Sequence, residues 1–466
     1  MNLYFVQHDY KYAAEQMLLT LFPAERPVYP EGEPAGERAE IYRDGEAMVC
    51  RLTLHGETWQ ARAEIEPFHT ERERIRMEQR AVKLCFYRAA LLSGVPRPAW
   101  GALTGVKPGK LMAQYLTLGK TAADFARDFD VTAERAALCE TTTRAALAAK
   151  ASLRPGDVGL YVGIPFCPTR CAYCSFISSA VGANEKLVAP YLDALMEEIR
   201  RRGEEVKRQN MRPVALYFGG GTPTTLSAEQ LDRLCAALKA AFDLSSLREY
   251  TVEAGRPDTI TAEKLEVLKA HGVTRVSVNP QTMSDDVLSA IGRAHTAQDV
   301  TDALSIVRAA GDFAVNMDLI AGLPKDTLAG FRETLETVLS LAPENITVHT
   351  LAIKNGSRLA QRPEDLPDAE TVGAMVEYSI RRLTDAGYEP YYLYRQKYMS
   401  GGFENVGWAK KDYVNLYNII MMEELCPVIA MGAGGSTKIT APDGSVRRQV
   451  NPKYPKEYIE RIRAAE

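Results

Sequence analysis

The amino-acid sequence predicts an α/β protein built around an open (β/α)6 partial TIM barrel, with an N-terminal α+β domain and a C-terminal α+β extension. Three observations support this fold class. From about Gly156, short apolar runs alternate with amphipathic helical patterns, which is typical of parallel strands joined by right-handed crossovers. Six such strands are fewer than the eight of a closed barrel. The alternation is absent before residue 156 and after residue 360.

Length and composition set the outer limits of the interpretation. The 466 residues suit two or three domains, and a hydrophobic content of 46% with 25% charged residues is ordinary for a globular protein. A net charge of −4 gives no case for binding nucleic acid or a membrane surface. The first nine residues lack the features of a signal peptide, and no apolar run reaches the ~20 residues of a membrane span. We therefore expect a cytoplasmic protein.

Residues 1–155 are expected to form an α+β domain of unknown role. A strand candidate, Leu3–Val6, precedes an amphipathic helical pattern. Turn signals at Asp44-Gly45 and His55-Gly56 separate three strand-like runs between residues 39 and 65, which predicts a β-meander. A helix is expected from about Thr70 to Leu92. Its arginine-rich start is usually a solvated face, with RNA contact as the alternative. The arginines are Arg72, Arg74, Arg76 and Arg80.

The expected barrel spans residues 156–360. Its six strand candidates are Val158–Val162, Val214–Phe218, Glu249–Glu253, Arg275–Val278, Ala314–Leu319 and Ile346–Leu351. One of the intervening helices opens with the capping-box pattern Ser227-x-x-Gln230. Residues 361–466 carry a helix from about Ala369 to Ala386 and a tyrosine-rich strand, Tyr391–Tyr394. We expect this extension to cover the open side of the barrel and to help form the substrate pocket.

Three cysteines follow the first strand at C-x3-C-x2-C spacing: Cys167, Cys171 and Cys174. A loop this tight can bring three thiolates to one soft metal centre. A structural zinc site needs four ligands, and no fourth Cys or His follows nearby. A [4Fe–4S] cluster held by only three thiols keeps one iron open, and we prefer this interpretation to zinc or to cysteines without a ligand. The other five cysteines are scattered and are expected to be small buried hydrophobes.

Polar or glycine residues lie at the ends of the other predicted strands, where parallel barrels carry their active sites. The second strand runs into Gly219-Gly220-Gly221, whose N–H groups can face an anion, unless the run is a plain tight turn. The third ends at Glu253, a ligand carboxylate or a surface ion pair. Arg293, beyond the fourth, can fork onto a carboxylate, or form a structural ion pair. Asp318 lies in an apolar run, where an ionised carboxylate is costly without a partner. His349, on the sixth, is more often a core histidine.

Together these motifs resemble those of the oxygen-independent coproporphyrinogen III oxidase (coproporphyrinogen dehydrogenase) family of radical S-adenosylmethionine (SAM) enzymes. The resemblance rests on Ile-Pro-Phe-Cys-Pro-x-x-Cys-x-Tyr-Cys at 164–174, Gly-Gly-Gly-Thr-Pro-Thr at 219–224 and Asp-Leu-Ile-x-Gly-Leu-Pro at 318–324. The phrases Val252–Asp258 and Asn279–Thr282, with the long N-terminal domain, make it most similar to the HemZ branch.

The resemblance implies a [4Fe–4S] cluster on Cys167, Cys171 and Cys174, and SAM as the second cofactor. The family's SAM contacts match Tyr161, Gly220, Gly221, Thr222, Glu253, Gln281, Arg293, Asp318 and Ala352. Some of these contacts belong to a second SAM in well-studied members, with the residue at Tyr173 beside it. The implied chemistry begins with one electron, from a donor such as flavodoxin or ferredoxin. SAM is cleaved to methionine and a 5′-deoxyadenosyl radical, which removes hydrogen from a propionate. Loss of CO2 and one electron then leaves a vinyl group.

Two departures bear on the substrate. Phe176 stands where the oxidases have a further cysteine, as it does in the haem-chaperone relatives, and the oxidases' N-terminal segment has no recognisable equivalent. The His-Asn-x-x-Tyr-Trp stretch of the chaperones is not evident either. We expect conversion of the tetrapyrrole coproporphyrinogen III to protoporphyrinogen IX. The alternatives are a haem-binding or haem-delivery protein, with His349 or His295 as axial ligand, and a radical SAM enzyme acting on another tetrapyrrole. Cations expected near the substrate propionates are Arg256, Lys354, Arg395 and Lys397.

Overall fold

A computed structural model describes residues 1–174, 179–353, 357, 359, 365–396, 402–440 and 446–464. The chain divides into two compact units, the first made up mainly of Met1–Glu140 and the second mainly of Thr141–Glu466. Helix α5 (Ala133–Ser152) carries the chain from one unit into the other. Within the described residues, no helix is both long enough and apolar enough to cross a membrane.

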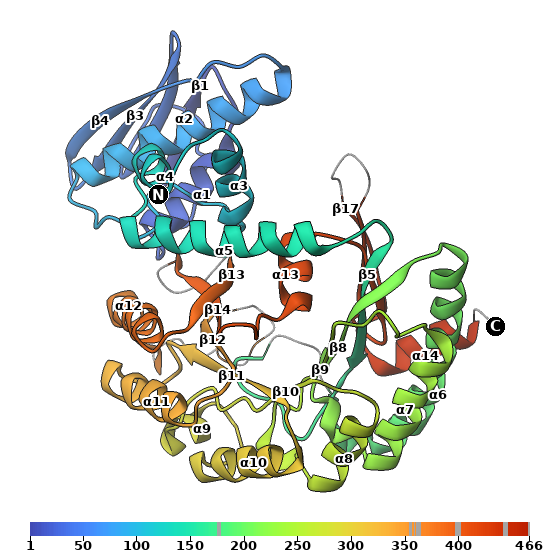
Figure 1. The fold of residues 1–466 in the computed structure, drawn as a ribbon. Helices are drawn as coiled ribbons and strands as arrows, with labels where there is room; N and C mark the ends of the chain where they lie inside the picture. Colours follow the sequence, from blue (N-terminus) through green and yellow to red (C-terminus); the bar gives the residue numbers. More distant parts are fainter. Residues whose placement is uncertain are drawn as a thin grey trace. The chain divides into compact units, whose positions relative to one another are not determined.

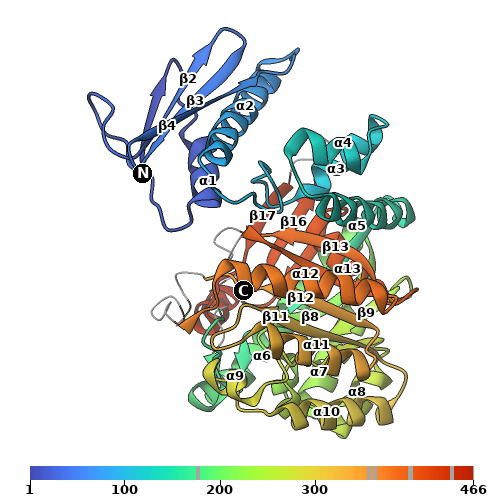
Figure 2. The same ribbon diagram turned by 90° about the vertical axis from the view of Figure 1, so that its left-hand side faces the viewer.

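The first unit is a four-stranded sheet with two helices on one face (Figure 2). Its strands β1 (Asn2–Val6), β2 (Arg38–Asp44), β3 (Ala47–Leu54) and β4 (Glu57–Glu64) lie in that order. Strand β1 pairs parallel with β2, and β2, β3 and β4 form the predicted antiparallel meander. The turn at His55-Gly56 has positive φ at both residues, as a two-residue hairpin turn requires.

The core of this unit lies between the sheet and its two long helices, α1 (Lys11–Leu21) and α2 (Glu71–Leu92). Leu52 on β3 and Phe86 on α2 are fully buried there. The predicted helix start is confirmed, because Thr70 caps α2 in a capping box with Glu73. The shorter helices α3 (Pro108–Thr117) and α4 (Ala122–Phe129) follow.

Two arginines on the predicted basic face of α2 are paired with carboxylates. Arg74 donates to Glu71 and to the buried Glu78, and Arg80 donates to Glu66. These pairs favour the interpretation of the face as a set of structural and solvated charges over RNA contact.

The second unit contains an eleven-stranded sheet that confirms the predicted open barrel (Figure 1). Its six central strands run parallel and are neighbours in chain order: β5 (Asp157–Ile164), β8 (Arg212–Gly220), β9 (Glu249–Val252), β10 (Arg275–Ser277), β11 (Ala314–Ala321) and β12 (Asn345–Thr350). Helices lie on the outside of this curved sheet in Figure 1. They are α6 (Val181–Arg208), α7 (Ala228–Ala241), α8 (Ala262–Ala270), α9 (Asp285–Ala290), α10 (Ala297–Ala310) and α11 (Leu328–Ser340).

The local sequence explains these elements. The parallel strands are buried on both faces and read as apolar runs; in β5 only Tyr161 is more than slightly exposed. The capping box predicted at Ser227 forms at the start of α7. Four short elements lie in the loops that follow the strands: the paired strands β6 (Phe166–Cys167) and β7 (Ser179–Ala180), and the turns η1 (Pro223–Thr225) and η2 (Pro257–Thr259).

The C-terminal extension continues the sheet at both ends of the six-strand set. Strand β15 (Val428–Met431) adds parallel to β5, followed by the antiparallel β16 (Ser436–Thr440) and β17 (Val446–Val450). At the other end, β14 (Glu404–Ala409) adds antiparallel to β12, and the predicted tyrosine strand, β13 (Glu389–Arg395), pairs with β14. Three helices complete the unit: α12 (Ala369–Asp385), α13 (Leu416–Glu423) and α14 (Pro455–Ala464).

Candidate functional site

The cysteine loop begins directly after β5 and is held against the glycine run that ends β8. Gly221 N donates to Ile164 O at 2.7 Å, and Thr222 N donates to Phe166 O at 2.7 Å. The hydroxyl of Thr222 lies 3.5 Å from Cys167 Sγ. A Cβ atom on Gly221 would lie only 2.4 Å from Phe166 O. Glycine is therefore required here because the two loops pack backbone to backbone.

Two arginines also contact the cysteine loop. Arg256 Nη1 lies 3.1 Å from Thr169 Oγ1 and 3.9 Å from Cys171 Sγ. Arg293 Nη2 donates to Tyr173 OH at 3.1 Å, and its Nη1 donates to the carbonyl oxygens of Asn279 and Gly255. Two guanidinium groups thus lie beside the cysteine loop, where their positive charge suits a bound anionic group.

The donor set of this loop fits an iron–sulfur cluster. Cys167 and Cys174 are half-buried and Cys171 is buried. In the described part of the chain, no three His, Cys, Asp or Glu side chains gather closely enough to hold a single metal ion. The thiols of a [4Fe–4S] cluster ligate separate irons and stand further apart than ligands of one ion. The flanking arginines and the tight Gly221 contact also suit a loop that wraps an anionic group.

Two carboxylates lie on either side of strand β10 in the barrel: Glu253 directly after β9 and Asp318 within β11. Glu253 follows β9, and its Oε1 accepts a hydrogen bond from Tyr217 OH on β8. Burial raises the pKa of Glu253 to about 7; the Tyr217 hydrogen bond opposes this rise and the nearby charge of Asp318 adds to it. Asp318, on β11, accepts a hydrogen bond from Asn316 Nδ2 at 2.8 Å. This carboxylate pair provides a local negative charge for a cationic ligand.

His349 and Gln281 lie close to Asp318. His349 Nε2 is 3.9 Å from Asp318 Oδ2, and the His349 side chain is 29% exposed. Gln281 bridges to β11 by donating from its N to Asp318 O and accepting from Ile320 N. Its φ of +67° is unusual for a non-glycine residue, and such strain is commonly retained at functional sites.

Three stacked tyrosines fill the space beside Glu253, and sequence reasoning identified only one of them, Tyr161. Tyr217 and Tyr417 stack with ring centroids 4.5 Å apart, and Tyr161 lies 6.4 Å from Tyr217 and 6.3 Å from Tyr417. Tyr217 is the register partner of Tyr161 on adjacent strands, so the strand pattern could have revealed it. Tyr417 comes from α13 and carries no such signal.

The cations that the sequence suggested as partners of the substrate propionates lie in different surroundings. Arg256 lies against the cysteine loop, as described above. Arg395 is buried at the end of β13, where burial lowers its pKa to about 10 against the opposing effect of Glu404. Lys354 and Lys397 lie outside the described residues. His295 is 3% exposed, and burial, together with Arg293 and Arg256, lowers its pKa to about 4.

The fold and the site define a class of protein. Residues 161–338 match the family model of the radical SAM superfamily, whose members use a [4Fe–4S] cluster and SAM. The chain shares 37% identity over 406 residues with the oxygen-independent coproporphyrinogen-III oxidase-like protein HemZ of Bacillus subtilis, covering 85% of this chain and 81% of that protein. The chain therefore belongs to the oxygen-independent coproporphyrinogen III oxidase-like family of radical SAM proteins.

Other similar proteins are named either as oxygen-independent coproporphyrinogen III oxidases or as heme chaperones. The oxygen-independent coproporphyrinogen III oxidase of Salmonella typhimurium is 32% identical over 58% of this chain and 56% of its own. The heme chaperone HemW of Escherichia coli is 28% identical over 65% of this chain and 76% of its own. The structure of coproporphyrinogen III oxidase (HemN) from Escherichia coli superposes with a TM-score of 0.55 and 27% identity, covering 68% of this chain and 72% of that one.

Proposed function

We propose that this radical SAM protein oxidatively decarboxylates the propionates of coproporphyrinogen III to vinyl groups, giving protoporphyrinogen IX. The observation that carries the proposal is the assembly of one constellation above the parallel strands. Tyr173 and Asn279 join Arg293 to the cysteine loop and to Asp318 on β11. Glu253, which accepts a hydrogen bond from Tyr217, lies close enough to Asp318 for their charges to interact. The substrate is inferred from relatives named as oxidases of this compound.

Each residue has a proposed role that follows from its chemistry. Cys167, Cys171 and Cys174 would hold the cluster. The backbone of Gly220, Gly221 and Thr222 would approach the amino-acid part of SAM, and Arg293, whose buried Nε has no hydrogen-bond partner among the described residues, would bind its carboxylate. Glu253 and Asp318 would bind its hydroxyl or cationic groups. The further contacts proposed for SAM are Tyr161, Tyr173, Gln281 and Ala352.

When bound, the reduced cluster and SAM together supply a carbon radical that removes hydrogen from the substrate. The chain must keep water away from that step. Tyr417 is 3% exposed, and its stack with Tyr161 and Tyr217 would keep water away from the side of the site at Glu253. Excluding water strengthens the electrostatic interactions of the site and prevents side reactions.

The decisive experiment is anaerobic reconstitution followed by a product assay. The reconstituted protein, reduced by flavodoxin or ferredoxin or by dithionite, is incubated with SAM, coproporphyrinogen III and a one-electron acceptor that takes up the electron released with CO2. We expect 5′-deoxyadenosine, CO2 and protoporphyrinogen IX to form together. SAM cleavage without CO2 or vinyl product, from protein with a full cluster, would contradict the proposed substrate while leaving the radical SAM assignment in place.

A second candidate function is haem binding or delivery, which the HemW relatives and the position of His349 favour. Its imidazole lies at the strand ends and is partly accessible, as an axial iron ligand must be. Stoichiometric haem binding that is lost in His349→Ala, combined with no decarboxylation by the intact reconstituted protein, would decide for this function. A vinyl product from a different tetrapyrrole would decide for a third possibility, a radical SAM enzyme of other specificity.

A further inference from the structure

Arg256 is a buried cation anchored by a carboxylate from its own turn. It immediately precedes η2 and is 3% exposed. Its Nε donates to Asp258 Oδ1 at 3.0 Å and its Nη2 donates to Asp258 Oδ2 at 3.2 Å. This two-point pairing fixes the plane of the guanidinium group. The remaining nitrogen, Nη1, is left to face the cysteine loop.

That remaining nitrogen reaches the loop at two positions. It donates to Thr169 Oγ1 at 3.1 Å and lies 3.9 Å from Cys171 Sγ. Thr169 in turn donates to Gly292 O at 3.4 Å, next to Arg293. Arg256 therefore joins the turn after β9 to the middle cysteine of the motif. The sequence suggested Arg256 as a partner for substrate propionates, and these contacts point to a second role for its guanidinium group.

The surroundings preserve the positive charge beside Cys171. The side chain of Asp258 is 32% exposed, so water screens its negative charge more than it screens the 4% exposed side chain of Arg256. His295 lies close to both arginines, and neither of its ring nitrogens has a hydrogen-bond partner within the described residues. Burial next to Arg293 and Arg256 keeps its imidazole neutral.

We propose that Arg256 positions the cysteine loop and raises the reduction potential of the cluster that the loop holds. The inference rests on the cluster site proposed above. Reduction adds one electron, and therefore one negative charge, to a group whose thiolate ligands are already anionic. A buried guanidinium beside one of those sulfurs stabilises the reduced form more than the oxidised form. Net charge and hydrogen bonds to sulfur are established determinants of cluster potentials.

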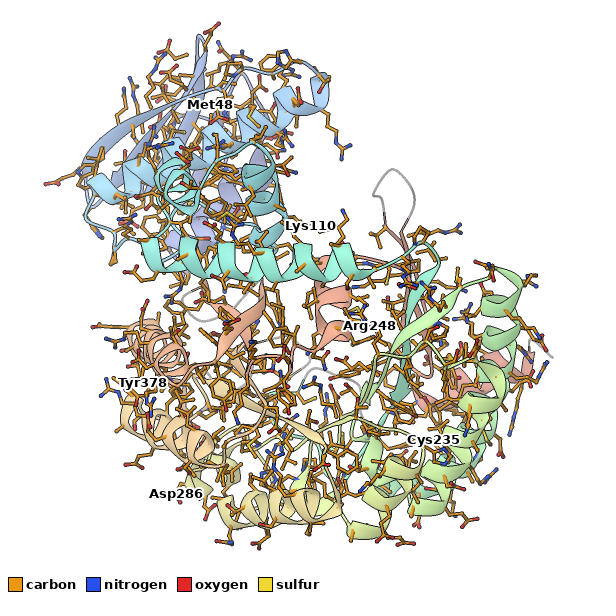
Figure 3. The ribbon with its side chains drawn as sticks, in the orientation of Figure 1. Met48, Lys110, Cys235, Arg248, Asp286 and Tyr378 are labelled. Carbon is orange, nitrogen blue, oxygen red and sulfur yellow. The ribbon has the colours of Figure 1, made fainter. Side chains whose placement is uncertain are left out.

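The test measures the potential of the reconstituted cluster without SAM or substrate. Arg256→Gln and Arg256→Met remove the charge, and Arg256→Lys keeps it without the two-point pairing. The control is Arg382→Gln, because Arg382 makes a similar two-point pair with Glu336 (2.7 and 2.9 Å) on the outer helices, beside Tyr378 (Figure 3). Iron content, dithionite titration followed by electron paramagnetic resonance, and thermal unfolding are measured for each protein.

We expect the neutral variants to keep about four irons per chain and to hold about tenfold less reduced cluster at a fixed potential, a downward shift of about 59 mV for one electron. Arg256→Lys should recover part of the shift and Arg382→Gln should show none. An unchanged potential in a neutral variant that keeps its iron overturns the proposal. If neither neutral variant keeps iron, a lower potential in Arg256→Lys supports it and an unchanged one overturns it. A wild-type protein without a cluster would instead contradict the site itself.

Discussion

At the scale of single residues, the candidate site depends on polar groups held in unfavourable surroundings. Glu253 is the clearest example, because it is a carboxyl whose pKa of about 7 lies well above its usual range. Its neighbours are a phenol and a second carboxylate, with no cation among the causes of its shift. Such a group has a strong tendency to acquire a positive partner, and bound SAM, with its sulfonium, provides one.

The first prediction is that SAM affinity rises with pH through the titration of Glu253. Below pH 7 the carboxyl is protonated in the free protein, so SAM must displace a proton. We expect the dissociation constant to fall about fivefold from pH 6 to pH 7, about tenfold from pH 6 to pH 8, and to level off above pH 8. Calorimetric titration of Glu253→Gln should give a weaker and flatter dependence, and the exposed Glu333→Gln should match the wild type.

Stability without ligand should follow the opposite course. In the folded protein the pKa of Glu253 is raised above the unfolded value of about 4.3. The stability that the protonated carboxyl contributes is therefore fully present below pH 4.3 and is lost as the pH rises through 7. Glu253→Gln should therefore raise the midpoint of thermal unfolding relative to wild type at pH 8 and leave it unchanged at pH 4. A variant that is less stable at pH 8 would show that the carboxylate is compensated in the folded state.

The second prediction concerns the cluster ligands. Cys171→Ala should lose the iron and the visible absorbance of the reconstituted protein. Cys235→Ala should keep both, because Cys235 lies on α7 in the outer helical layer (Figure 3), where it contacts Tyr250 OH and burial raises its pKa to about 11. Iron retained in Cys171→Ala, or zinc taken up in preference to iron, would refute the assignment.

At the scale of elements, the loops that follow the parallel strands carry the site, and the first two interlock. The glycine run at the end of β8 packs on the start of the cysteine loop without room for a side chain at Gly221. The glycines at this strand end are therefore as necessary for the shape of the site as the three cysteines are. The sequence showed both motifs but not that they touch.

The third prediction follows from this close packing. Gly221→Ala places a methyl group 2.4 Å from Phe166 O and 2.8 Å from Ile164 O, so the cysteine loop must move. We expect at least tenfold slower SAM cleavage and reduced iron content, at nearly unchanged secondary structure by circular dichroism. Gly105→Ala is the matched control, because nothing lies within 4 Å of its added Cβ. Equal iron and activity in the two variants would count against the interlocked loops.

The strand pattern could be predicted because buried parallel strands are apolar runs with polar residues at their ends. All six predicted barrel strands overlap observed ones, and Glu253 and Asp318 were identified in this way. Arg256 illustrates why the substrate candidates were harder to place. The long side chain of an arginine in a loop can reach several different partners. Only the fold shows that the guanidinium of Arg256 contacts Asp258 and Cys171.

At the scale of the whole molecule, the C-terminal extension is tied into the barrel by a buried carboxylate. Glu198, on α6, is 5% exposed and accepts hydrogen bonds from Gly432 N, Asn451 Nδ2 and Tyr458 OH at 2.6 to 2.9 Å. Gly432 lies so close to Gly163 at the end of β5 that an added Cβ would be 2.4 Å from Gly163 O. No sequence motif predicted this link, because its members are far apart in the chain.

The fourth prediction tests the link. Tyr458→Phe removes one of the donors to the buried Glu198 carboxylate and should lower the free energy of unfolding of the second unit by about 1–3 kcal/mol. Denaturant unfolding should show the loss, and Tyr454→Phe, at a 51% exposed position, should show almost none. If the two variants are equally stable, the carboxylate must be satisfied by other groups.

The parallel pairing of β5 with β15 also governs how the protein is made. The ribosome releases β5 long before Val428–Met431 exists, so the strand that leads into the cysteine loop waits with one edge unpaired throughout translation of the barrel. Unpaired edges recruit other chains. Nascent or truncated chains that end before β15 are therefore expected to associate with chaperones or to aggregate, and completion of the sheet becomes one of the last events of synthesis.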